Sequence, residues 1–452
     1  MGRTRSLGLR GVVSGMSEPL APPSVTAEPS PWFGQPRGLT VLFLTNMWEQ
    51  FSYYGMRALL VYYMTKQLLL SQETSSLVYG AYTACAYFTP IVGGVIADRF
   101  LGKRRAIVIG ASIMAAGHFM MAFEPLFYVA LATIALGNGL FLPTLPSQIN
   151  DLYTRDDPRR GWAYNVYYVG INIGGFLAPL ICGTLGEVYG WHYGFGAAGI
   201  GMLAGLAIYL SGQRYLPPEP PRQRNSEAKR SGGSMARQTI LALVAVALAV
   251  TVFRGAYEQV GNTVALWADK GVDRSAGGFA IPMTWFISLN PLFVILMTPP
   301  LLAYWGRRAA AGHDQAPARR MALGAAIVGA AYLMLAGAAW LSGDASAAWP
   351  WLAAFFVIFT FGELFILPTG LGLFARLAPP GLGATTVAAW YLAIFSGSLA
   401  AGFVGMLFGD LSDVQFFAML AGIAGLAALL LRQLDGLVRR AEPVWADPTE
   451  KL

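Results

Sequence analysis

Long apolar stretches separated by short polar ones run through the chain from residue 38 to residue 435. A helix of roughly 20 residues, rising about 1.5 Å per residue, crosses the hydrocarbon core of a bilayer. Because a helix satisfies its own backbone hydrogen bonds, we expect membrane-spanning helices rather than strands. The pattern predicts twelve crossings, at 38–65, 76–98, 105–123, 126–150, 161–186, 192–212, 238–262, 279–304, 320–341, 350–376, 383–408 and 414–435.

The longest polar interruption divides these crossings into six and six. Pro, Arg and Ser replace apolar residues between residues 213 and 237, which we interpret as a cytoplasmic linker. The first residues are also rich in Pro, Ser and Arg and lack a continuous apolar core, so they predict a disordered tail rather than a cleaved signal. The predicted organisation is a cytoplasmic tail at 1–37, a six-helix half at 38–212, the linker at 213–237, a second half at 238–436 and a cytoplasmic tail at 437–452.

Composition and charge agree with an all-α integral membrane protein. The chain is 55% hydrophobic and 12% charged, with a mean hydropathy of +0.51, whereas a soluble domain carries about 25% charged residues. Basic residues gather in every second loop, which by the positive-inside rule places both termini in the cytoplasm. The net charge of +7 is therefore interpreted as a topological signal and not as evidence for nucleic-acid binding. The cations are Arg99, Lys103, Arg104, Arg105, Arg155, Arg159, Arg160, Arg214, Arg222, Arg224, Lys229, Arg230, Arg237, Arg307, Arg308, Arg319 and Arg320, and the main exceptions on the opposite side are Lys270 and Arg274.

Five ionisable residues fall inside predicted crossings: Glu49, Arg57, Arg254, Glu258 and Glu363. Charges in hydrocarbon are costly and usually face a bundle interior or a substrate path. Counting along the helices at 1.5 Å per residue puts Arg57, Arg254 and Glu258 roughly 24–30 Å from the cytoplasmic ends, and Glu49 roughly 14 Å from it. Arg254 and Glu258 are four residues apart, so they share a helix face and can pair.

The depths therefore predict an outer group of Arg57, Arg254 and Glu258, which closes one side of a cavity, and an inner group of Glu49 and Glu363. An isolated carboxylate in a medium of low dielectric constant favours its protonated form, so the inner group is a candidate for proton uptake. Two plainer interpretations stay open. The carboxylates can join helices by hydrogen bonds, and Arg254 can extend its head group toward the outer interface.

Several functions lack support in the residues. Cys85 and Cys182 lie in separate crossings without metal-ligand spacing, so we expect neither a metal site nor a disulfide framework. We find no nucleophile–base arrangement and no phosphate-binding loop, so we expect no enzyme activity. The pattern favours a transporter, and we expect no bound cofactor.

The segments 51–61, 94–105 and 164–176 resemble the first helix, the loop between helices two and three, and the fifth helix of the proton-dependent oligopeptide transporter family of the major facilitator superfamily. Tyr257-Glu258-Gln259, the segment 285–291, Gly362-Glu363-Leu364 and Trp390 resemble helices seven, eight, ten and eleven. The resemblance implies two six-helix halves and proton-coupled import of di- and tripeptides. It also implies twelve helices here, because the short linker leaves no room for the two extra helices of many bacterial members.

The resemblance also implies roles for particular residues. The expected substrate-binding residues are Tyr53, Tyr54, Arg57, Tyr87, Asn172, Asn290, Glu363 and Trp390. Those expected in proton coupling or gating are Glu49, Arg57, Arg254, Glu258 and Glu363, and a cytoplasmic conformational latch is expected from Asp98, Arg99, Arg104 and Arg105. The aromatic residues can instead pack helices together, and the two asparagines can instead hydrogen-bond neighbouring helices.

The chain departs from the family at three charged positions. Asn46 and Gln50 stand where the Glu-x-x-Glu-Arg motif has its first Glu and its Arg, and Leu142 stands where helix four has Lys. Arg254 replaces a Trp one turn before Glu258. The departures leave two alternatives to peptide import open. The first keeps the fold but transports a cationic or conjugated small molecule, or acts as an uncoupled facilitator. The second is a membrane sensor that binds peptides without transporting them. The expected partners are small peptides and the lipid bilayer, in a monomer of a bacterial inner membrane.

Overall fold

The computed structural model describes residues 34–154, 157, 159–219, 237–313, 315–378 and 382–441. We call residues 34–219 the first half and residues 237–441 the second half. Helices of the first half are α1 (Arg37–Tyr62), η1 (Tyr63–Gln67), α2 (Gln72–Ile96), η2 (Ala97–Leu101), α3 (Lys103–Met120), η3 (Glu124–Leu126), α4 (Phe127–Phe141), α5 (Thr144–Asp151), α6 (Arg159–Ala178), η4 (Pro179–Gly183), η5 (Leu185–Tyr189), α7 (Trp191–Gly212) and η6 (Gln213–Tyr215).

The second half is also helical, with a few short strands. Its helices are α8 (Arg237–Tyr257), η7 (Glu258–Gly261), α9 (Thr263–Lys270), α10 (Met283–Ile287), α11 (Leu289–Ala310), α12 (Pro317–Ser342), α13 (Trp349–Arg376), α14 (Gly383–Met406), α15 (Asp413–Gln433) and α16 (Asp435–Ala441). Its strands are β1 (Val272–Asp273), β2 (Ser275–Ala276), β3 (Phe279–Ala280) and β4 (Ala347–Ala348). Strand β1 pairs in parallel with β4, and β2 forms an antiparallel hairpin with β3.

Consecutive helices join into twelve long helical segments among the described residues, six in each half. Ten of these segments are long and apolar enough to cross a membrane. The segments of α1 and α3 do not meet that standard. Helix α3 has only 18 residues and begins with Lys103, Arg104 and Arg105, and α1 carries polar residues along its middle, such as Asn46 and Glu49. The two helices still pack inside the first half, where many of their residues are buried.

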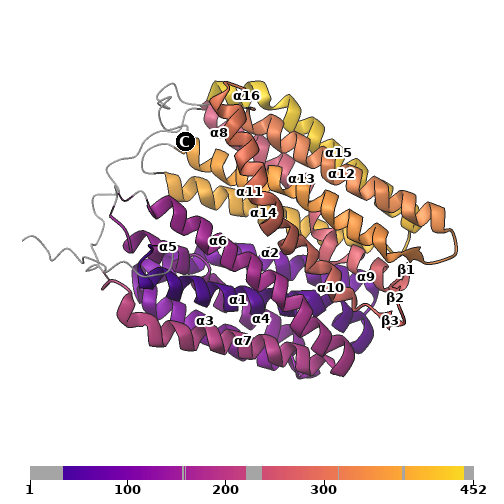
Figure 1. Ribbon diagram of the computed structural model, residues 1–452, viewed down its shortest axis with the longest axis horizontal. Coiled ribbons are helices and arrows are strands. Elements are labelled where there is room, and N and C mark those ends of the chain that lie inside the picture. Colours follow the sequence, from indigo (N-terminus) through magenta and orange to yellow (C-terminus); the bar gives the residue numbers. More distant parts are fainter. Residues whose placement is uncertain are drawn as a thin grey trace, which may run out of the picture.

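The two halves lie side by side along the length of the molecule (Figure 1). In the first half α1 packs against α6 and α7, and α3 packs against α4. In the second half α12 packs between α13 and α15. Helix α2 of the first half packs against α14 of the second, and α6 packs against α11, so these two helix pairs form the largest contacts between the halves.

Contacts between the halves gather at one end of the molecule, which we call the closed end. A Cβ atom added at Gly80 would lie 2.6 Å from the Gly402 Cα atom, so α2 and α14 nearly touch there. The Gln72 side chain donates a hydrogen bond to the Gly405 carbonyl oxygen (2.7 Å). On the other side of the interface, the Glu187 carboxylate accepts hydrogen bonds from the backbone N–H groups of residues 283 and 284 (3.0 and 2.9 Å).

At the opposite end, the open end, no such bridge joins described residues of the two halves. Every hydrogen bond and ion pair between described residues of the two halves involves residues 57–76 or 176–187 of the first half. None joins the segments 159–174 and 292–310, which run toward the open end on α6 and α11. The structure is therefore a bundle sealed at one end of the interface between its halves.

The fold class predicted from the sequence is correct: a mostly helical membrane protein built from two six-helix halves. The exact limits of the halves and tails remain predictions. Several of the predicted segments lie outside the described residues, namely residues 1–33 of the first tail, 220–236 of the linker and 442–452 of the last tail. The loop cations Arg155, Arg222, Arg224, Lys229 and Arg230 also lie outside them.

Candidate functional site

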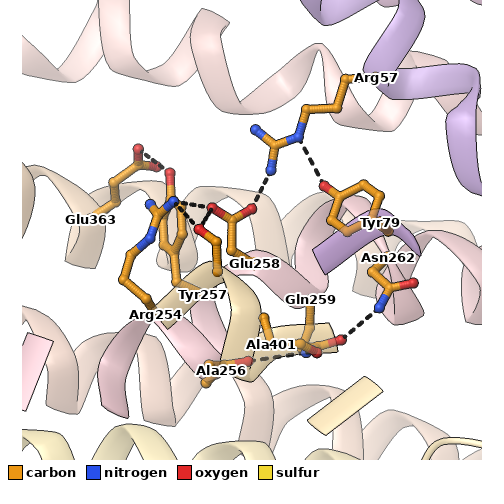
Figure 2. Close-up of polar contacts among 12 residues, drawn as sticks. Arg57, Tyr79, Arg254, Ala256, Tyr257, Glu258, Gln259, Asn262, Glu363 and Ala401 are labelled. Carbon is orange, nitrogen blue, oxygen red and sulfur yellow. Dashed lines mark hydrogen bonds and ion pairs between the residues drawn. The ribbon is translucent and has the colours of Figure 1, made fainter. Parts of the chain in front are cut away.

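A group of three charges, of which Arg254 and Glu258 are buried and Arg57 is partly buried, lies between the halves. Helix α8 ends at Tyr257, and Glu258 begins the short 3-10 helix η7 that follows it. Arg254 lies one turn earlier and forms an ion pair with Glu258. Arg57 of α1 reaches the same carboxylate from the first half, so Glu258 lies between two guanidinium groups (Figure 2). We call Arg57, Arg254 and Glu258 the charge triad; the pairing of Arg254 with Glu258 that the sequence predicts is present.

Neutral groups complete the surroundings of the triad. The Arg57 Nε atom donates to the Tyr79 hydroxyl (2.9 Å), and Arg254 donates to the Ser398 hydroxyl (3.2 Å). The Arg254 guanidinium lies 5.3 Å from the ring centre of Tyr87 and 4.7 Å from that of Tyr257, within the range of cation–π contacts. The Arg254 side chain is only 2% exposed. It is therefore held inside the bundle rather than extended toward the membrane surface.

Glu363 lies beside the triad. Its carboxylate accepts a hydrogen bond from the Tyr257 hydroxyl (2.7 Å) and one from the Asn290 side-chain amide (2.6 Å). Arg254 lies within electrostatic reach of the same carboxylate (Figure 2). The expected grouping of Glu363 with Glu49, away from any cation, is therefore wrong. Depth along a helix does not reveal which helix face a residue occupies, and the face of α13 that carries Glu363 points to α8 and α11.

Glu49 lies on α1 without a nearby cation. The side chain is 1% exposed, and its carboxylate accepts a hydrogen bond from the neighbouring Gln50 amide (2.7 Å). Asn46, one turn earlier, donates to the Tyr167 carbonyl oxygen (3.3 Å). Among the described residues Glu49 has no ion-pair partner, as expected from the absence of a cation at Gln50. The residue is thus a lone buried carboxyl group inside the first half.

The remaining predicted substrate residues lie in different surroundings. Tyr53 and Tyr54 contact each other edge to face, with ring centres 5.4 Å apart. Asn172 donates to the Tyr168 carbonyl oxygen within its own helix (2.9 Å). Trp390 is 3% exposed and packs against Phe374 inside the second half, which agrees with the packing role left open in the sequence analysis.

The predicted latch residues lie at the open end of the first half. The Arg104 guanidinium donates to the carbonyl oxygens of residues 216 and 217 (both 2.9 Å), which ties the start of the linker to α3. The adjacent Lys103 forms an ion pair with Asp151 (2.7 Å). Within the described ranges Asp98 and Arg99 have no ion-pair partner. These contacts stay within the first half.

Sequence reasoning missed the partners that complete the site. Tyr79 and Ser398 were not singled out, because a single hydroxyl in an apolar helix has no distinctive spacing. Gly80 and Gly402 were also missed, although their close approach brings α2 and α14 together. The described residues contain no group of His, Cys, Asp or Glu that could hold a metal ion.

The fold and the buried charges between its halves define a secondary transporter of the major facilitator type. A family model described as "PTR2: POT family" matches residues 104–232 and 229–416, more than half of the chain. The chain therefore belongs to the POT family, the proton-dependent oligopeptide transporters. The sequence-based family assignment is confirmed.

Curated relatives and solved structures agree with this assignment. The chain is 31% identical to a di-/tripeptide transporter of Lactococcus lactis, over 87% of this chain and 94% of that protein. It is also 31% identical to a peptide transporter of Yersinia enterocolitica, over 83% of this chain and 88% of that protein. A crystal structure of a peptide transporter POT in complex with sulfate matches with a TM-score of 0.84 at 28% identity, covering 92% of this chain and 98% of that one.

Proposed function

We propose that this protein imports di- and tripeptides together with protons by alternating access. The observation that carries the proposal is the charge triad beside Glu363, buried at the interface of two halves that are sealed at one end only. The names of the relatives support peptides as the cargo. The proposal includes no catalytic step and no cofactor, and the proton is the coupling ion.

The charges around Glu363 suit a zwitterion. A peptide needs an anion near its amino group and a cation near its carboxylate. Glu363, held by Tyr257 and Asn290, supplies the anion. The triad has two cations for one carboxylate, so one positive charge remains uncompensated within it. We propose that Arg254 or Arg57 uses that charge to hold the peptide carboxylate, in place of the cations that Gln50 and Leu142 do not provide.

The same triad provides a gate. Arg57 lies in the first half and Glu258 in the second, so their ion pair bridges the halves near the closed end. Opening that end separates α1 from η7 and breaks the pair. Arg254 stays with Glu258 because both residues lie on one helical segment. We propose that Glu258 keeps one partner in every state, and that Glu49 or Glu363 takes up the coupling proton.

We further propose that the open end faces the cytoplasm. The positive loops at Arg99–Arg105 and Arg307–Arg320 lie at that end, and cytoplasmic loops are enriched in Lys and Arg. The chain then has both termini in the cytoplasm and works as a monomer in a bacterial inner membrane. In this orientation the structure corresponds to an inward-open state.

The test is uptake of dialanine and trialanine by the purified protein in liposomes, with and without an inward proton gradient. We expect the gradient to accelerate uptake, and Glu363→Gln to abolish that acceleration, because the variant removes a carboxyl group that both binds substrate and is a candidate proton site. Empty liposomes and Gly196→Ala, whose added Cβ would meet nothing within 4 Å, are the controls.

Two results would contradict the proposal. Uptake that the gradient does not change would remove proton coupling and leave a facilitator. An absence of peptide uptake and of peptide counterflow, in protein that melts cooperatively, would remove peptides as the cargo.

A further inference from the structure

A pocket outside the transport interface opens between α11, α12 and α13. The cavity has a volume of about 630 Å³. Its apolar walls come from Leu296 and Leu301 on α11, Leu323 on α12, and Phe361 and Phe365 on α13. Helix α12 lies on the side of the second half that is turned away from the first (Figure 1). No residue of the charge triad, nor Glu363 or its two hydrogen-bond partners, lines the pocket, and several lining side chains are exposed, so the pocket is separate from the triad and faces the surroundings of the bundle.

The depth of the pocket matches one leaflet of a bilayer. Leu296 and Arg308 are twelve positions apart on α11, which is about 18 Å along a helix. Half of the hydrocarbon core is about 15 Å thick. Several wall residues are strongly exposed, including Leu296 (58%) and Leu323 (44%). Such a surface is stable beside acyl chains and unfavourable in water.

The mouth of the pocket is cationic and aromatic. Arg308, His313 and Arg320 line it at the turn between α11 and α12. Arg308 donates from Nη1 to the Tyr304 hydroxyl (3.0 Å), and its Nε atom is buried without a hydrogen-bond partner among the described residues. The Arg320 guanidinium lies 4.5 Å from the ring centre of Trp305. No Asp or Glu is among the described residues that line the pocket.

We propose that this pocket binds an anionic phospholipid of the leaflet at the open end. Its phosphate would contact the Arg308 guanidinium, whose Nε donor is unused, and an acyl chain would lie along the apolar walls toward Leu296. Basic pockets between transmembrane helices on the cytoplasmic side are typical sites for acidic head groups. A soluble anion would use only the mouth and would leave the apolar walls exposed. The proposal does not depend on which solute the protein transports.

The test is native mass spectrometry of the full-length protein in detergent with phosphatidylglycerol or phosphatidylcholine. We expect phosphatidylglycerol to bind more tightly, and Arg308→Gln to weaken its binding about fivefold, the effect of one basic residue near a membrane surface. Arg307→Gln is the matched control, because Arg307 is the adjacent exposed arginine and does not line the pocket. Arg308→Lys retains the charge and should retain most of the binding.

A second set of measurements locates the acyl chain of the bound lipid. Leu323→Trp fills the apolar wall and should weaken phosphatidylglycerol binding while Arg308 is intact. Fluorescence quenching by brominated phosphatidylglycerol should fall in Trp305→Phe, because Trp305 lines the pocket. Equal losses in Arg307→Gln and Arg308→Gln would overturn the proposal in favour of a diffuse surface charge. Full competition by glycerophosphoglycerol, or no effect of Leu323→Trp, would overturn it in favour of a soluble anion at the mouth.

Discussion

Glu258 has two arginine partners although one would neutralise it. Removing one member of a buried ion pair is costly because the remaining charge stays in a medium of low dielectric constant. The Glu258 and Arg254 side chains are 1% and 2% exposed, so this cost applies to both. The consequences differ for the two residues. Loss of Arg254 leaves Arg57 paired with Glu258, whereas loss of Glu258 leaves the buried Arg254 and the partly buried Arg57 as two cations without their shared carboxylate.

We therefore expect Glu258→Gln to destabilise the protein more than Arg254→Gln. Breaking a buried pair from one side costs roughly 3–5 kcal/mol, and this should lower the melting temperature of the detergent-purified Glu258→Gln variant clearly. The double variant Arg254→Gln/Glu258→Gln should recover part of the loss, because a single cation then remains. A lower melting temperature for Arg254→Gln than for Glu258→Gln would contradict this account of the triad.

At the scale of the helix, the closed end depends on how closely α2 and α14 approach. The nearest atoms to an added Cβ at Gly80 are backbone atoms of Gly402, at 2.6 and 2.7 Å. Backbone atoms cannot move aside as a flexible side chain can, so even a methyl group forces the two helices apart. The glycine pair is therefore a determinant of closure rather than a general packing feature.

We expect Gly80→Ala to shift the protein toward states that are open at the closed end. Spin labels at Glu73 and Asp410, which are exposed near the ends of α2 and α14, should report longer distances by double electron–electron resonance. The background carries Cys85→Ser and Cys182→Ser, since both cysteines are free. Gly196→Ala is the control, because its added Cβ meets nothing within 4 Å. A distance distribution identical to that of the control would refute the role of this glycine pair.

At the scale of the whole molecule, the proposed orientation places the open end in the cytoplasm. This orientation follows from the basic loops, because cytoplasmic loops carry an excess of Lys and Arg. Two exposed positions allow a direct measurement. Ser275 lies in the β2–β3 hairpin of the closed end, and Ala311 lies in the turn after α11 at the open end.

In the same background without cysteines, Ser275→Cys should react with a membrane-impermeant maleimide in intact cells. Ala311→Cys should react only after the membrane is permeabilised, because positive loops are retained in the cytoplasm. Labelling of Ala311→Cys in intact cells would reverse the proposed orientation and would make the structure outward-open.

Hydropathy, loop charge and motif order were sufficient to predict the class of the protein, its helices and its family. These features are local: a run of apolar residues predicts a crossing without reference to any other part of the chain. The pairing of Arg254 with Glu258 was equally local, because four residues make one helical turn. The isolation of Glu49 also followed from the sequence, since Gln50 occupies the position of its expected cation.

Only the tertiary structure decided how distant groups meet. Arg57 and Glu258 are 201 residues apart in the chain, and their contact depends on how two helices are rotated about their own axes. The rotation of the helix that carries Glu363 likewise brings this residue to Tyr257 and Asn290, and not into a group with Glu49. The rotation of the helix that carries Trp390 places that side chain in the packing of the second half. The closed end and the pocket between α11 and α12 are likewise properties of packed helices, because each is formed by faces that a hydropathy pattern cannot orient.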